Sequence, residues 1–97
     1  MIQHIVLLSF NEKTTKEQKE EAISRAKLLK EDIPGIIDIQ AGLNFSEKAQ
    51  GFEIGLTLLL EDKKALENYG PHPKHQELLA YLKEIGISDR IIMDFYV

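Results

Sequence analysis

The pattern of apolar and polar residues marks four segments of the chain as β-strands. Residues 2–10 form a run of β-branched and large apolar residues. Residues 36–44 and 52–60 alternate between apolar and polar residues with the two-residue period of a strand, and residues 90–97 form the last segment. The pattern therefore predicts four strands.

A helical period replaces the alternation between the first two strands. Within residues 15–32, apolar residues recur three or four positions apart, from Ala22 and Ala26 onward. Thr15 with Gln18, or Thr14 with Glu17, has the spacing of a capping box, which favours a helix start at this point. Pro34 and Gly35 then end the predicted helix.

The second helical region follows the third strand and is interrupted. Asp62 is a suitable cap for a short helix that carries Ala65, Leu66 and Tyr69. Gly70-Pro71 breaks this helix. Pro73 suits the first position of a new helix and Gly86 its end.

These elements give the order β-α-β-β-α-β over residues 1–97, which form a single domain without repeats or a linker. This order is the split βαβ pattern of ferredoxin-like folds. We therefore expect an α+β protein in which a four-stranded antiparallel sheet carries both helical segments on one face.

Alternate side chains of a strand point to opposite faces of the sheet, so each strand divides into two sets. We assign the more apolar set of each strand to the face under the helices: Ile2, Val6, Leu8, Phe10; Ile37, Ile39, Leu43; Phe52, Ile54, Leu56, Leu58, Leu60; Ile91, Met93, Phe95. The other sets would form the open face: Gln3, Ile5, Leu7, Ser9; Ile36, Asp38, Gln40; Glu53, Thr57, Leu59; Ile92, Asp94, Tyr96. Such a mixed face predicts a homodimer that packs sheet to sheet.

Composition narrows the classes of function. The net charge of −4 disfavours nucleic acids and anionic membranes as partners, because both are bound through clustered Lys and Arg. The chain has no cysteine, so disulfides, thiol nucleophiles and Cys-ligated zinc are absent. Residues 1–10 lack the features of a signal peptide, and we expect a cytoplasmic protein.

The segment Tyr69-Gly70-Pro71-His72-Pro73-Lys74-His75 concentrates the reactive side chains of the chain. A neutral His75 could act as a general base, and the Tyr69 hydroxyl could hold or protonate an enolate. A surface turn with Tyr69 packed on the core is the alternative.

His72 and His75 are three residues apart, but no acidic residue or cysteine is placed to complete a metal site, so we expect no metal. His72 could instead fix the helix start by local hydrogen bonding.

His4 shares its strand face with Val6 and Leu8. It could be a core histidine with a hydrogen-bond partner, or it could line a pocket between the sheet and the helices. Such pockets are mostly apolar and contain a few placed polar groups.

The whole chain resembles the stress-responsive dimeric A/B barrel (Dabb) family. The resemblance is carried by Met1-Ile2-Gln3-His4-Ile5-Val6, Ile33-Pro34-Gly35-Ile36, Gly42-Leu43-Asn44 and, above all, residues 69–75, which match the family's Tyr-x-x-His-Pro-x-His signature. It implies a dimeric α/β barrel. The family includes a plant polyketide cyclase that closes its substrate by intramolecular aldol condensation, as well as plant stress proteins and many bacterial proteins of unknown role.

The resemblance implies that Tyr69 and His75 are a catalytic pair and that His4 lines the pocket. The expected ligand is a small hydrophobic or carbonyl-bearing molecule in contact with His4, Val6, Leu8, Ile54 and His72, with no cofactor. In the first helix, Ala22, Ile23 and Ala26 stand where the cyclase has aromatic residues, so the substrate is left open. The alternative is a stress-response or structural dimer without catalytic activity.

Overall fold

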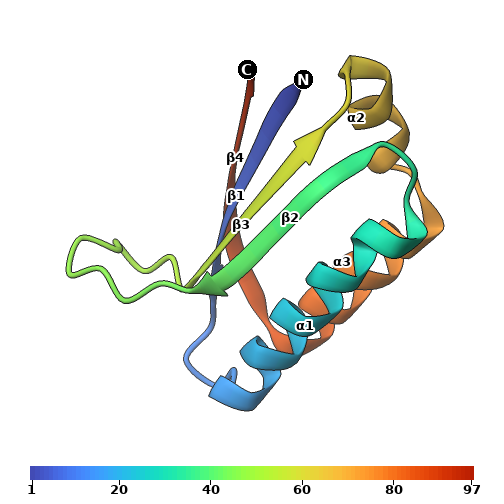
Figure 1. Cartoon of the computed structure of the whole chain (residues 1–97). Helices are drawn as coiled ribbons and strands as arrows, with labels where there is room; N and C mark the ends of the chain where they lie inside the picture. Colours follow the sequence, from blue (N-terminus) through green and yellow to red (C-terminus); the bar gives the residue numbers. More distant parts are fainter.

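One four-stranded sheet carries all the helices on the same side (Figure 1). The computed structural model describes all 97 residues. In chain order the elements are β1 (Ile2–Phe10), α1 (Lys16–Asp32), β2 (Ile36–Leu43), β3 (Ile54–Leu60), α2 (Lys63–Tyr69), α3 (Pro73–Ile85) and β4 (Ile87–Tyr96). The predicted ferredoxin-like fold is confirmed, and the second helical region consists of α2 and α3.

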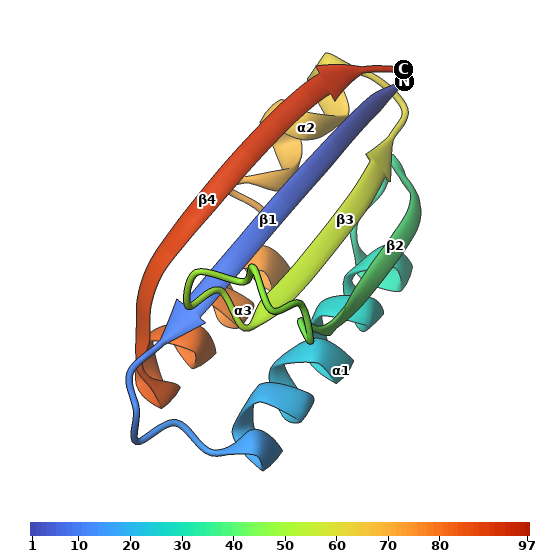
Figure 2. The ribbon, with the colours of Figure 1, turned by 90° about the vertical axis from the view of Figure 1, so that its left-hand side faces the viewer.

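The strands lie in the order β2-β3-β1-β4, and every neighbouring pair is antiparallel. Figure 2 shows the sheet from its open side, with α1 and α3 behind it. The central strand β1 alternates strictly between buried and half-buried residues. The buried residues of β1 and of β3 face the helices. They are Ile2, His4, Val6, Leu8 and Phe10 in β1, and Ile54, Leu56, Leu58 and Leu60 in β3.

The helix boundaries follow the predicted caps. The Thr15 side chain accepts a hydrogen bond from the Gln18 backbone N–H, while the Gln18 side chain accepts one from the Thr15 N–H, which completes the capping box. Asp62 caps α2 by accepting from the Ala65 N–H at 2.8 Å. None of the three helices has the length and apolar character that a membrane span requires.

The strand β4 presents its faces in the reverse of the expected way. His4 is paired with Asp94 and Leu8 with Arg90. Directly paired residues point to the same face of a sheet, so the β4 residues on the helix side are Arg90, Ile92, Asp94 and Tyr96. The open face receives Ile91, Met93 and Phe95 instead. The assignment from apolar content was therefore wrong for this strand.

The start of β2 also departs from the expected alternation. A β-bulge lies between Ile36 and Asp38 and shifts the pairing with β3 by one residue. Ile36 consequently joins the buried core, whereas Ile37 is partly exposed. The two isoleucines thus exchange the positions that simple alternation gave them.

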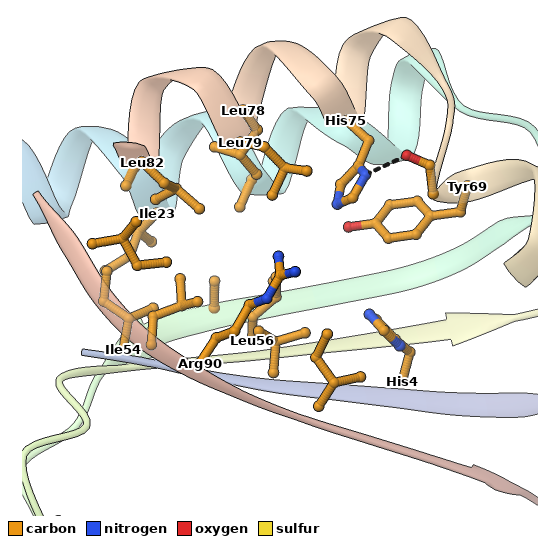
Figure 3. A pocket seen from close by; sticks show the side chains of 18 of the residues that line it. His4, Ile23, Ile54, Leu56, Tyr69, His75, Leu78, Leu79, Leu82 and Arg90 are labelled. Carbon is orange, nitrogen blue, oxygen red and sulfur yellow. Dashed lines mark hydrogen bonds between the residues drawn. The ribbon is translucent and has the colours of Figure 1, made fainter. Parts of the chain in front are cut away.

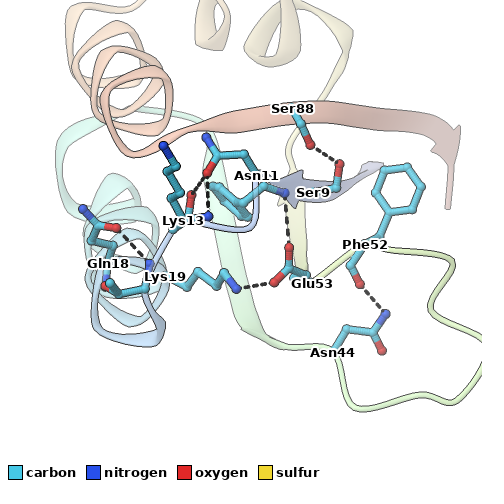
Figure 4. Close-up of polar contacts among 12 residues, drawn as sticks. Ser9, Asn11, Lys13, Gln18, Lys19, Asn44, Phe52, Glu53 and Ser88 are labelled. Carbon is cyan, nitrogen blue, oxygen red and sulfur yellow. Dashed lines mark hydrogen bonds and ion pairs between the residues drawn. The ribbon is translucent and has the colours of Figure 1, made fainter.

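Glu53 lies just before β3 and does not belong to the open sheet face. Its carboxylate pairs with Lys19 of α1 and accepts a hydrogen bond from the Phe10 N–H at 3.3 Å (Figure 4). This ion pair holds the loop before β3 against the first helix. The expectation for Glu53 is corrected accordingly.

The turn between α3 and β4 is held closely against the loop after β1. Gly86 ends α3 with a φ of 108°, and its carbonyl accepts a hydrogen bond from the Asn11 N–H at 2.9 Å. A Cβ at Gly86 would overlap with the Asn11 side-chain amide and lie 2.9 Å from the Thr14 hydroxyl oxygen. This position therefore requires glycine both for its backbone conformation and for its close approach.

Candidate functional site

An apolar cavity of about 280 Å³ lies between the sheet and the helices α1 and α3 (Figure 3). Fifteen of the 20 residues that line it are hydrophobic. Val6, Leu8 and Ile54, which the sequence analysis proposed as its wall, all line it. For scale, an apolar cavity of about 150 Å³ can hold benzene. This cavity is large enough for a ligand of about two fused rings.

Small residues on the surrounding elements leave this space open. Ala22 and Ala26 of α1 and Ala41 of β2 line the cavity. Because a methyl side chain fills little of the gap between a helix and a sheet, close packing is incomplete here. Larger side chains at these three positions would reduce the cavity.

The break between α2 and α3 brings Tyr69 and His75 together. Tyr69 is the last residue of α2, Gly70 caps that helix, and His75 lies in the first turn of α3. The two aromatic rings have centroids 4.2 Å apart. The Gly70 carbonyl accepts hydrogen bonds from His75 Nδ1 and Gln76 Nε2, both at 2.8 Å. These bonds fix the junction and, with it, the His75 ring.

The hydrogen bond to Gly70 determines the tautomer of His75. A carbonyl oxygen can only accept, so Nδ1 carries the proton and Nε2 has a free lone pair in the neutral ring. Burial lowers the pKa of His75, although the bond to Gly70 acts in the opposite direction. His75 is therefore neutral near pH 7, and Figure 3 shows its second nitrogen directed into the cavity. The free Nε2 atom of His75 can therefore accept a proton from a ligand, as a general base does.

The Tyr69 hydroxyl points into the cavity, and no hydrogen bond joins it to the other residues of the site (Figure 3). The residue as a whole is only 3% exposed. Burial raises the pKa of Tyr69, so the hydroxyl keeps its proton at neutral pH. It can therefore donate a hydrogen bond to an oxygen atom of a ligand.

His4 lies on the opposite wall of the cavity and is oriented by Asp94. His4 Nδ1 donates to the Asp94 carboxylate, and the His4 ring meets the Tyr69 ring edge-on at 5.6 Å between centroids. Both interpretations left open for His4 thus hold, since it has a hydrogen-bond partner and also lines the cavity. Asp94 was missed as a site residue because it had been assigned to the open face. The pairing of β1 with β4 is the signal that could have found it.

His72 does not line the cavity, although it was predicted to be among the ligand contacts. It is the N-cap of α3, where its Nδ1 accepts a hydrogen bond from the Lys74 N–H at 3.1 Å. His72 and His75 therefore each use a ring nitrogen to hold the helix junction. No group of three or more His, Asp or Glu side chains is arranged to bind a metal ion.

Arg90 is a second residue of the cavity that was not predicted from the sequence. It extends from β4, and its guanidinium reaches into the cavity from the sheet side (Figure 3). Arg90 and Ile92 are both exposed as well as part of the cavity wall. The opening of the cavity consequently lies along β4.

The sequence profile of a family described as the Stress responsive A/B Barrel Domain matches residues 2–97. No curated protein sequence matches the chain.

Three solved structures show how far the architecture is shared. The protein At3g17210 of Arabidopsis thaliana is 23% identical, with 100% of this chain and 95% of that chain covered and a TM-score of 0.88. A dimeric ferredoxin-like protein of unknown function from Thermobifida fusca is 25% identical, with coverages of 99% and 90% and a TM-score of 0.86. A hydroxynitrile lyase from Passiflora edulis is 14% identical, with coverages of 99% and 92% and a TM-score of 0.85. Together they support the ferredoxin-like fold.

Proposed function

The chain belongs to the stress-responsive A/B barrel family, and we propose that it binds a small, mostly apolar carbonyl compound and transfers a proton at the carbon next to the carbonyl. His75 is the base and Tyr69 the hydrogen-bond donor to the carbonyl oxygen. The observation that carries this proposal is the pair itself. A neutral imidazole nitrogen and a protonated hydroxyl, neither bound to another protein group, face one apolar cavity.

The proposed step is balanced within the site. His75 Nε2 takes the proton, and the electrons of the broken C–H bond form a carbon–carbon double bond. The carbonyl oxygen becomes an enolate oxygen, which the Tyr69 hydroxyl stabilises by hydrogen bonding. The enolate carbon can then regain a proton or attack a second carbonyl of the same molecule, which is aldol chemistry.

The test uses 2-acetylnaphthalene, a two-ring methyl ketone chosen to match the cavity. In D₂O, the wild-type protein should exchange the methyl protons of the probe for deuterium faster than buffer does, as followed by ¹H NMR. His75→Ala should reduce the rate to that of buffer. His72→Asn is the matched control, because it removes a neighbouring imidazole that does not line the cavity but keeps a side chain that can cap α3, and it should retain exchange.

Two results would count against the proposal. If the probe binds but the wild-type protein gives no exchange above buffer, the site binds ligands without this chemistry. If the probe does not bind at all, the stress-response or structural alternative is favoured, because the cavity would then be only a packing feature.

We also propose that the chain forms a homodimer through the open sheet face. The support is the set of exposed apolar side chains that β4 presents there, namely Ile91, Met93 and Phe95. The related protein from Thermobifida fusca is itself described as dimeric. Light scattering after size-exclusion chromatography should give twice the mass of the chain, and Met93→Asp should give the monomer. Leu28→Asp, which changes an exposed apolar residue on α1, should leave the dimer intact.

A further inference from the structure

Arg90 is the one permanently charged residue among the 20 that line the cavity. Its guanidinium forms no ion pair and no side-chain hydrogen bond in the protein. Asp94 lies on the same face of β4, but its carboxylate is bound to His4. Asp94 is also four residues along the strand, which is about 13 Å at the usual rise of a β-strand. The cavity therefore holds a positive charge without a negative partner.

The surroundings of Arg90 support a ligand-binding role more strongly than its lack of an ion-pair partner does. Arg90 is exposed at the mouth of the cavity, but its side chain extends along an apolar wall toward Tyr69 and His75 (Figure 3). A guanidinium binds a carboxylate through two parallel hydrogen bonds, and such bonds strengthen where water is excluded. Arg90 also contributes to lowering the pKa of His75, which fits a cation close to the proposed base.

We propose that the ligand of this cavity is an apolar carboxylic acid whose carboxylate is bound by Arg90 at the mouth along β4. This inference rests on the proposed function and names the ligand class of the same site. The apolar part of the ligand would lie against Leu8 and Ile54, with its carbonyl at Tyr69. A single guanidinium matches a single negative charge, and the cavity wall offers no second cation for a doubly charged phosphate ester.

The experiment compares two probes of nearly equal size. 2-Naphthoate carries the carboxylate, and 2-acetylnaphthalene is its neutral counterpart. Both are titrated into the full-length protein and followed by naphthalene fluorescence. Arg90→Gln should weaken 2-naphthoate binding by about 10- to 100-fold, the usual effect of losing a charge-assisted hydrogen bond. The affinity for 2-acetylnaphthalene should change less than about threefold, which also shows that the variant is folded.

Two further variants test the chemistry of the contact. Arg90→Lys keeps the charge but loses the paired geometry, so 2-naphthoate should bind with intermediate affinity. Arg25→Gln changes the net charge by the same amount at an arginine that does not line the cavity, and it should leave both affinities unchanged.

The possible failures can be distinguished. If 2-naphthoate binds wild-type protein and Arg90→Gln equally well, the role of Arg90 is refuted while the ligand site remains. If Arg90→Gln weakens both probes equally, Arg90 shapes the cavity and does not recognise a carboxylate. If neither probe binds the wild-type protein, both this inference and the proposed ligand-binding function are wrong.

Discussion

Replacing Tyr69 by phenylalanine separates a chemical role of this residue from a structural one. The Tyr69 ring packs against His75 and His4, and phenylalanine preserves those contacts. No hydrogen bond joins the hydroxyl to the other residues of the site (Figure 3). Removing it therefore breaks no bond in the folded protein. We expect the free energy of unfolding to change by less than about 0.5 kcal/mol.

The effect on proton exchange should be much larger. Loss of a positioned acid or hydrogen-bond donor typically lowers a rate by about 10²- to 10⁴-fold. This range corresponds to about 3–5 kcal/mol in the activation free energy. If the hydroxyl instead held the core together, its loss would leave a buried partner unsatisfied at a cost of about 1–3 kcal/mol. The two explanations therefore predict opposite patterns of stability and rate.

Stability would be measured by urea unfolding, followed by far-UV circular dichroism because the chain has no tryptophan. The rate would be measured by deuterium exchange into 2-acetylnaphthalene. Tyr81→Phe is the matched control, since the Tyr81 hydroxyl donates to the Gln18 carbonyl and does not line the cavity. It should lower stability by up to about 1 kcal/mol and leave exchange intact. The reasoning is refuted if Tyr69→Phe destabilises the protein by more than about 1 kcal/mol and leaves exchange unchanged.

Three other predictions concern the fold around the site. Burial lowers the pKa of His75, so the unfolded chain binds more protons than the native state as pH falls below about 6.5, and stability should decrease over that range. Urea titrations between about pH 5 and pH 8 should show a smaller decrease for His75→Gln, and an equal decrease would contradict this origin. Asp94→Ala should lower the free energy of unfolding by about 1–3 kcal/mol because buried His4 loses its partner, and no loss would mean that the pair contributes nothing. Gly86→Ala should lower the melting temperature more than Gly51→Ala, because both glycines have positive φ but only a Cβ at Gly86 would meet neighbouring atoms. Equal effects of the two substitutions would show that this close approach does not contribute to stability.

Local signals in the sequence predicted most of the fold. A run of β-branched and large apolar residues located β1 at residues 2–10, and the capping residues Thr15 and Asp62 marked the starts of α1 and α2. The same Gly-Pro break that separates α2 from α3 predicted that Tyr69 and His75 lie at a helix junction. Such signals are local because caps and turns are satisfied by backbone groups only a few residues away.

The cavity could not be predicted in this way, because its volume depends on how far apart the packed elements remain. The helical period alone showed Ala22 and Ala26 as members of an apolar helical stripe. In the structure they are buried and also line the open space under α1. Two alanines in such a stripe are compatible both with tight packing and with a pocket. The distance between helix and sheet decides between them, and distant parts of the chain set that distance.

The strand β4 shows why apolar content alone cannot orient a strand. Ile91, Met93 and Phe95 form the more apolar set, and they lie on the open face proposed for the dimer. The more polar set lies on the helix side of the sheet, where Arg90 lines the cavity and Asp94 is bound to His4. When both faces of a sheet are covered, only the pairing with a neighbouring strand reveals which face is which. In the proposed dimer, alternate residues of β4 would contribute to the dimer interface and to the ligand site. Formation of the dimer would therefore hold Arg90 and Asp94 in position.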